Sequence, residues 1–201
     1  MTQANVIVDA IPLLDKLRSL EPEIERRFPK GPLHGLDVIG LNLVLPYKHG
    51  GYEHSPQNTR MFAETRGDGT HFSFLSQNGK IDAASPVVMT EPSGFANVIV
   101  GKSFRDFLCF GLIRGYFFME QLVYSPADTL AAYNSANWQD PSGDDWPSEN
   151  SRNVLAFIAD SLELQPLAYS PAEFQAMQDA LLPQLDLPPN LLKSEVRFSE
   201  R

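Results

Sequence analysis

The chain has 201 residues, of which 43% are hydrophobic and 20% are charged, a composition typical of a globular protein rather than a disordered chain. The formal net charge of −9 is unevenly placed: residues 1–119 carry 12 acidic and 12 basic side chains, whereas residues 120–201 carry 13 and 4. An acidic surface argues against nucleic acid or an anionic membrane as a partner, and it suits a basic protein.

The N-terminal part is predicted to hold a helical region and a buried strand. Asp9 is placed to cap the helix, whose apolar residues recur at the spacing of one helical face: Leu13, Leu17, Leu20, Ile24 and Phe28. Pro22 lies inside this pattern, so a kink or two short helices are expected. Residues 36–45 are apolar and β-rich and are expected to form a buried strand, followed by a polar loop over 48–58.

Residues 59–101 show the period-two alternation of short strands separated by turn signals. Strands are expected at 61–66, 70–76, 86–90 and 97–101. Phe72 and Phe74 share one face of the second strand and are expected to be core, with His71 on the opposite face. Gly67-Asp68-Gly69 and Asn78-Gly79 supply turns, because glycine readily adopts positive φ.

A helix is predicted to begin at Ser103, which is a favoured capping residue. Its buried stripe is formed by apolar side chains at helical spacing: Phe104, Phe107, Leu108 and Leu112.

The stretch from Thr59 to Val123 also resembles a known family. The segments that carry the resemblance are GDGTHFSFL, PVVMTEP, NVIVGKSFRDFLCFG and GYFFMEQL. Together they are similar to the SUKH superfamily of small α+β domains, many of which are immunity proteins that bind and neutralise bacterial toxins. The resemblance implies a SUKH-like domain with a protein partner, and it supplies no catalytic set to carry onto these residues.

The C-terminal part is predicted to be helical. Tyr124-Ser-Pro-Ala-Asp128 and Tyr169-Ser-Pro-Ala-Glu173 each combine a capping serine, a first-turn proline and an acid, which indicates helices over 126–134 and 171–182. Tyr169 and Phe174 are spaced as a hydrophobic staple. A third amphipathic helix is expected around 154–162. Residues 124–201 therefore form an acidic helical extension of the central module 59–123, within one domain covering 1–201.

The loop between these helices is the candidate protein-binding site. Its composition is rich in Pro, Gly and acids, and it carries both tryptophans of the chain. Tryptophan is enriched among interface hot spots, and acids steer a basic partner. The alternative is that both indoles fold back onto the core. The candidate residues are Trp138, Asp140, Asp144, Asp145, Trp146 and Glu149.

A rival hypothesis is a metal-dependent hydrolase that uses His49, His54, Asp68 and His71. The histidines lack the tight ligand spacing of a zinc site, so we expect no metal and no cofactor. Glu64, Asp68 and Glu91 are further acids that sequence alone does not bring together.

Cysteine usage and the N-terminus indicate the compartment. Cys109 is the sole cysteine and lies in an apolar string, so it is interpreted as buried and no internal disulfide is expected. Neither a secretory signal nor a membrane span is found in the sequence, so a cytoplasmic location is expected.

The sequence thus predicts a single α+β domain in which an antiparallel-rich sheet packs against helices from the N-terminal and C-terminal parts. The expected function is non-catalytic protein binding, with immunity against a basic toxin, such as a nuclease, implied by the resemblance and the charge. A housekeeping interaction domain is the other alternative.

Overall fold

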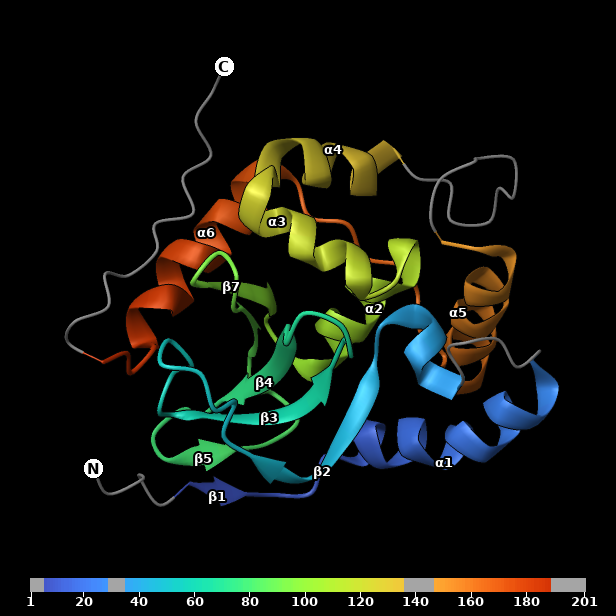
Figure 1. The fold of residues 1–201 in the computed structure, drawn as a ribbon, viewed down its shortest axis with the longest axis horizontal. Coiled ribbons are helices and arrows are strands. Elements are labelled where there is room, and N and C mark those ends of the chain that lie inside the picture. The colour runs from blue at the N-terminus through green and yellow to red at the C-terminus, as the bar shows by residue number, and fades with distance from the viewer. Residues whose placement is uncertain (1–5, 29–34, 136–146, 189–201) are drawn as a thin grey trace.

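A computed structural model describes residues 6–28, 35–135 and 147–188, and its described part is a mixed α+β domain (Figure 1). The strands are β1 Ile7–Val8, β2 Asn42–Lys48, β3 Thr59–Glu64, β4 His71–Leu75, β5 Lys80–Ile81, β6 Val87–Glu91 and β7 Ala96–Gly101. The α-helices are α1 Pro12–Arg27, α2 Phe104–Arg114, α3 Gln121–Tyr124, α4 Pro126–Ser135, α5 Glu149–Leu162 and α6 Pro171–Leu181. Three 3-10 helices cover Gly35–Ile39, Phe117–Glu120 and Leu182–Gln184.

A five-stranded antiparallel sheet in the order β2-β3-β4-β6-β7 forms the centre, and β1 pairs with β5 in a small parallel sheet. The four strands predicted from residues 59–101 correspond to β3, β4, β6 and β7. At the predicted Asn78-Gly79 turn, both residues have positive φ, and Gln77 pairs with Lys80 across it. The α+β fold class is therefore confirmed.

One face of the sheet packs on α2, which begins where Ser103 Oγ accepts a hydrogen bond from the backbone N–H of Asp106 at 3.1 Å. Phe74 stacks on Phe62 with 4.3 Å between ring centroids, and Phe107 lies 4.9 Å from Phe72. These four phenylalanines are fully buried, which confirms that Phe72 and Phe74 are core.

The opposite face is buried as well. His71, Ser73 and Leu75 are at most 1% exposed, and the loop over 49–58 covers His71, whose Nε2 lies 3.4 Å from Ser55 Oγ. The carbonyl of His54 accepts a hydrogen bond from the Asn97 amide at 2.9 Å, which fixes the loop to β7. His71 lies on the face opposite Phe72 and Phe74, as predicted, and both faces of the strand are interior.

The free edge of β7 is closed by a side chain. Gln178 of α6 accepts a hydrogen bond from Ile99 N–H at 2.9 Å and donates to Ile99 C=O at 2.8 Å. Its amide thereby replaces the backbone groups of a further strand. The helix start is firm, because Ser170 and Glu173 form a reciprocal capping box and Tyr169 packs 6.0 Å from Phe174, as the staple predicted.

Two N-terminal predictions were wrong. Residues 36–45 do not form one buried strand: a 3-10 helix covers Gly35–Ile39 and β2 is a partly exposed edge strand. Gly35 and Gly40 have positive φ and break the extended run. Asp9 does not cap α1, because the N-cap position is occupied by Ile11. The carboxylate of Asp9 instead lies 2.8 Å from Lys80 Nζ.

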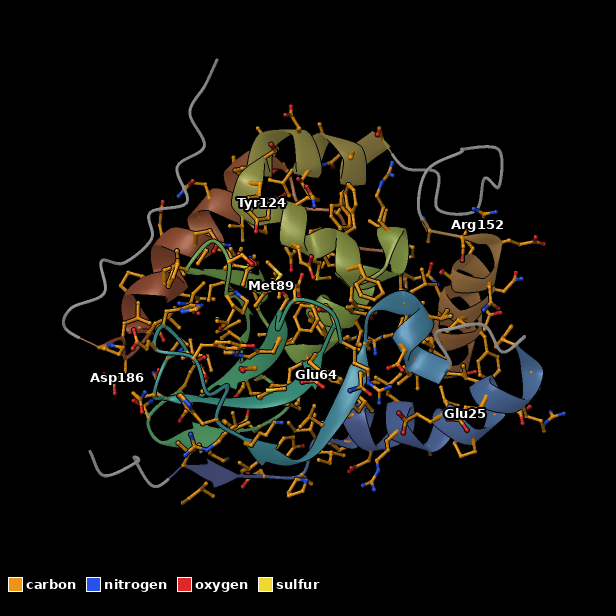
Figure 2. The ribbon with its side chains drawn as sticks, viewed as in Figure 1. Glu25, Glu64, Met89, Tyr124, Arg152 and Asp186 are labelled. Atoms are coloured by element: carbon orange, nitrogen blue, oxygen red, sulfur yellow. The ribbon has the colours of Figure 1, made fainter. Side chains whose placement is uncertain are left out.

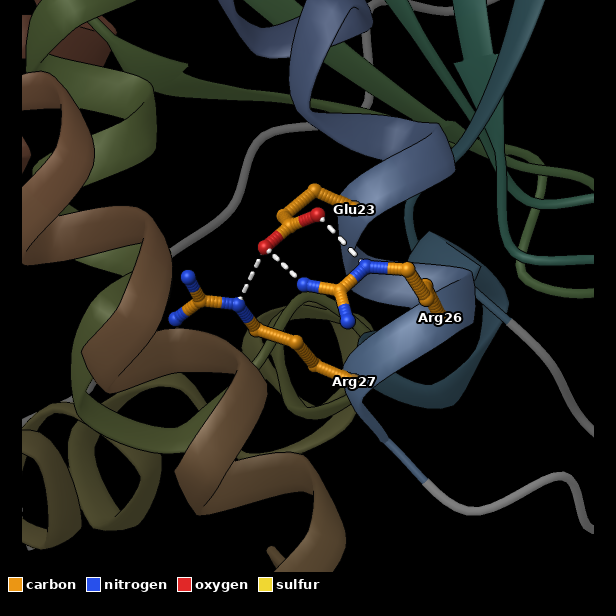
Figure 3. Close-up of polar contacts among 3 residues, drawn as sticks. All are labelled: Glu23, Arg26 and Arg27. Atoms are coloured by element: carbon orange, nitrogen blue, oxygen red, sulfur yellow. Dashed lines mark hydrogen bonds and ion pairs between the residues drawn. The ribbon is translucent and has the colours of Figure 1, made fainter.

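The first helix is one continuous element with Pro22 inside it, rather than two short helices. Near its end Glu23 accepts hydrogen bonds from Arg26 and Arg27, which lower the pKa of Glu23 to about 2 (Figure 3). These groups are exposed, so their contribution to stability is small. The helix is held instead by its buried residues Leu14, Leu17 and Ile24. Phe28, which follows α1, lies 5.9 Å from Phe157 of α5, and Arg27 lies over the same ring.

Phe74→Ala is expected to lower the free energy of unfolding by about 3–5 kcal/mol, because it empties a fully buried aromatic site. Chemical denaturation measures the change. Phe95→Ala removes the same ring from a residue that is 65% exposed and should change stability by about 0.5 kcal/mol or less. Equal losses in the two variants would contradict the burial pattern.

Candidate protein-binding surface

Three exposed aromatic side chains gather at one end of the sheet, although they come from separate parts of the chain. Tyr52 is 40% exposed, Phe95 65% and Tyr124 56%. Tyr52 and Phe95 both pack against the ring of His54, at 5.9 and 5.4 Å between centroids. Tyr124 lies beside Gly94, the neighbour of Phe95. We call Tyr52, Phe95 and Tyr124 the aromatic patch.

The turn between β6 and β7 presents Phe95 in a strained conformation. The Glu91 carboxylate accepts hydrogen bonds from the backbone N–H groups of Ser93 and Gly94, which fixes the turn. Phe95 then has φ +50°, a left-handed conformation that costs a bulky residue about 1–3 kcal/mol. Its ring contributes little to the core, so folding does not account for a phenylalanine here.

Tyr52 lies over the end of β4 and is held by two buried contacts. Its ring stacks on His71 at 5.7 Å, and its backbone N–H donates to Ser55 Oγ at 3.3 Å. A Cβ atom at Gly50 would collide with His71 Nε2, so this loop reaches the sheet only because residue 50 is glycine.

His71 is built into this packing as a neutral ring. Its Nδ1 faces the Gly69 carbonyl at 3.0 Å and therefore carries the proton, while Nε2 accepts from Ser55 Oγ at 3.4 Å. Burial lowers the pKa of His71, and burial likewise lowers that of His54. Ser55 is fully buried and already accepts the Tyr52 N–H, so it is a turn-stabilising hydroxyl rather than an accessible nucleophile.

Two carboxyl groups meet next to the aromatic patch. Asp68 Oδ1 accepts hydrogen bonds from Thr65 Oγ1 at 3.2 Å and from Thr70 N–H at 2.9 Å. Burial and the neighbouring Asp68 raise the pKa of Glu120 to about 7. Burial opposes ionisation of Asp68, but hydrogen bonds from Thr70 and Glu120 outweigh it and lower its pKa. One proton shared between the two carboxyls explains both directions.

The three acids named from the sequence, Glu64, Asp68 and Glu91, therefore do not form one cluster, because each has different partners. Asp68 joins Glu120 and does not orient a histidine. Glu91 closes its own turn and also hydrogen-bonds the Tyr124 hydroxyl, whereas Glu64 accepts from the Asn42 amide on β2 at 3.2 Å.

The candidate residues Trp138, Asp140, Asp144, Asp145 and Trp146 lie outside the described residues. Glu149 is described: it is exposed and begins α5, behind the capping Ser148. Figure 2 shows Tyr124 on α3 well apart from Arg152 on α5, so the aromatic patch and the start of α5 occupy different regions of the surface.

Within residues 6–28, 35–135 and 147–188, no group of three or more His, Cys, Asp or Glu side chains is placed to hold a metal ion. His49 and His54 are near enough to lower the pKa of His71. The two ring nitrogens of His71, however, face the Gly69 carbonyl and Ser55 Oγ. Cys109 is buried, as predicted, and burial raises the pKa of its thiol.

Sequence reasoning missed Phe95, Tyr52 and Glu120. A signal existed for Phe95, because an aromatic residue directly after Pro92-Ser-Gly94 in a turn has no strand face to fill. Glu120 carried no such signal, since its partner Asp68 is 52 residues away and only the fold joins them.

No protein-family model matches the chain, and no curated protein matches it significantly. None of the helices in the described part is long and apolar enough to cross a membrane.

Stability should respond to pH through Glu120. Its folded pKa of about 7 lies above the unfolded value of 4.5, so the folded state binds more protons between these values. The contribution of Glu120 to the free energy of unfolding is therefore fully present below pH 4.5 and is lost as the pH rises through 7. Glu120→Gln should gain stability relative to wild type as the pH rises from 5 to 8.

The difference between wild type and Glu120→Gln isolates this effect from His54 and His71, whose lowered pKa values act with the opposite sign. Urea denaturation at several pH values measures it. Glu149→Gln removes an exposed acid on α5 and is the matched control. A difference for Glu120→Gln that is constant with pH would contradict the shared proton.

Proposed function

We propose that this chain is a non-catalytic protein-binding domain, and the aromatic patch is the observation that carries the proposal. Exposed aromatic rings that do not serve the core are typical hot-spot residues at interfaces. Phe95 adds a second reason, because its backbone is strained although its ring is solvent-exposed.

The charge around the aromatic patch supports a basic partner. Asp68, Glu91 and Glu120 lie beside Tyr124, and residues 120–201 hold the whole net charge of −9. Acidic surfaces accelerate association with basic proteins through long-range attraction. The tryptophan-bearing loop, with Trp138 and Trp146, is proposed as a second contact region.

An immunity-type role is the specific form of the proposal. It is supported by the resemblance of residues 59–123 to the SUKH superfamily, and it makes the partner a basic bacterial toxin, such as a nuclease. A housekeeping interaction domain would use the same surface with a different partner. Co-expression distinguishes the two, because only an immunity protein restores growth to cells that produce its toxin.

The hydrolase hypothesis receives no support from the described geometry. Both ring nitrogens of His71 make contacts, one with the Gly69 carbonyl and one with Ser55 Oγ, and Asp68 faces Glu120 rather than a histidine. These contacts are accounted for by a structural role of His71 and Asp68 in the fold.

Phe95→Gly is expected to weaken capture of the partner from a host extract at least about tenfold, since a hot-spot ring is lost. Glycine adopts φ +50° freely, so the free energy of unfolding should change by no more than about 1 kcal/mol. Quantitative mass spectrometry of proteins retained by the tagged chain measures capture.

Ile7→Ala is the matched control for this experiment. Ile7 is 67% exposed, like Phe95, but lies on β1, away from the aromatic patch. Its substitution should leave capture unchanged. Undiminished capture by Phe95→Gly, or an equal loss in both variants, would remove the aromatic patch from the interface.

Purified protein is expected to contain no stoichiometric zinc, manganese or iron, because the histidines lack ligand spacing and His71 is already engaged. Elemental analysis after purification without chelators or metal affinity resin tests this. One equivalent of metal that disappears in a His49→Ala/His71→Ala variant would favour the hydrolase instead.

A further inference from the structure

We propose that the loop over 49–58 is an acid-sensitive latch: when the buried ring of His71 takes up a proton, the loop opens and the aromatic patch comes apart. This inference rests on the proposed protein-binding function and assigns a form of regulation to the same surface. The loop carries Tyr52, one member of the patch, and His54, whose ring lies 5.4 Å from that of Phe95. Opening therefore removes Tyr52 and leaves Phe95 without its neighbour.

His71 on β4 is where the closed loop meets the sheet. Its ring is 1% exposed and stacks on Tyr52 at 5.7 Å, and its Nε2 lies 3.4 Å from Ser55 Oγ. The backbone of Gly50 lies against the same nitrogen, because a Cβ atom at that position would collide with it. Closure of the loop and burial of this ring are therefore one event.

The hydrogen bonds under the loop require a neutral ring. Nδ1 faces the Gly69 carbonyl at 3.0 Å and carries the proton, while Nε2 accepts from the hydroxyl of Ser55, which itself accepts the Tyr52 N–H at 3.3 Å. A proton on Nε2 would turn two donors toward Ser55 Oγ and leave the hydroxyl proton without its acceptor. Ser55 is fully buried, so solvent does not replace that acceptor.

The closed loop offers the protonated ring little compensating charge. None of the ion pairs within the described residues includes a histidine. The titratable groups that face His71 are His54, His49 and Tyr52 from the loop and Glu64 from β3, and its cross-strand neighbour on β6 is the uncharged Thr90. Burial, followed by the charges of His54 and His49, lowers the pKa of His71 against the opposing effects of the Gly69 carbonyl and Glu64.

His54 acts in the same direction from the loop itself. Its side chain is 4% exposed and lies between the rings of Tyr52 and Phe95. Burial lowers its pKa, although Glu91 and Glu53 act in the opposite direction. Opening of the loop returns this ring to water as well, so its protonation also favours the open state.

The sign of the response follows from these contacts. In the open loop His71 has its ordinary pKa of 6.5, and in the closed loop a lower one, so the open state binds more protons as the pH falls. Closure is therefore complete above pH 6.5 and weakens below it. For this one histidine the ratio of open to closed loop should rise about three- to tenfold between pH 7.5 and pH 5.5.

Amide hydrogen exchange of the full chain, read by NMR at pH 5.5 and 7.5 and corrected for intrinsic exchange, measures opening. The reporters are the N–H groups of Tyr52 and Ser55, which bond within the loop, and the reference is Gly115 N–H at the end of α2. Protection of the two reporters should fall at pH 5.5 relative to the reference.

His71→Gln keeps a polar side chain beneath Ser55 but does not titrate, so the response of the wild type should exceed that of this variant about three- to tenfold. His49→Gln makes the same change on a half-buried residue of the loop and is the matched control, with a response within about twofold of wild type. Equal responses in wild type and His71→Gln would overturn the latch. NMR titration of the His71 ring in the wild type decides the question without a variant, since a pKa at or above 6.5 would also overturn it.

Capture of the partner by the tagged chain at the two pH values tests the regulation. Capture should weaken at pH 5.5 in wild type, and weaken less in His71→Gln. The exchange measurement needs no partner, so protection that ignores pH, with capture still lost in Phe95→Gly, would refute the latch and leave the protein-binding function standing. Protection that falls with pH while capture stays constant would overturn the regulation of the aromatic patch.

Discussion

The structure depends on the burial of the central strands on both faces. On one face, aliphatic and aromatic side chains are buried by packing on α2. The other face carries the polar residues His71, Ser73 and Thr90, which are buried too. Buried polar groups need hydrogen-bond partners or they cost stability. The loop over 49–58 brings Ser55 to His71 and the His54 carbonyl to Asn97. Asn58 holds the far end of this loop, since its side chain bonds the backbone of residues 184 and 186.

The exposed features are a consequence of this closure. Once the loop lies over β4, Tyr52 is left above His71, partly exposed and next to the turn that carries Asp68. The β6–β7 turn brings Phe95 to the same end of the sheet. The buried, hydrogen-bonded polar layer beneath places these side chains, so a binding surface made from loop residues is supported by the sheet.

Much of the fold was accessible from the sequence because its signals are local. Alternation gave the strands of residues 59–101, and the Ser-Pro-Ala-Glu segment gave the start of α6 with its capping box. The predictions that failed involve conformations or contacts that the local pattern does not reveal. Residues 36–45 were assigned to a strand by β propensity, but Gly35 and Gly40 adopt positive φ and interrupt the extended run. Asp9 is a residue type suited to capping, but its carboxylate pairs with Lys80 instead. The carboxyl pair was out of reach for the same reason, since pairing of Asp68 with Glu120 requires the fold.

Both edges of the sheet constrain how a partner binds. A common mode of recognition adds a strand to a free edge, using backbone hydrogen bonds. At β7 the amide of Gln178 already occupies the N–H and C=O of Ile99. At β2 the edge contains Pro46, which has no N–H, and ends in Lys48, a charged residue that discourages pairing. Recognition by this domain is therefore expected to proceed through side chains, and the exposed aromatic rings at the end of the sheet are available for it.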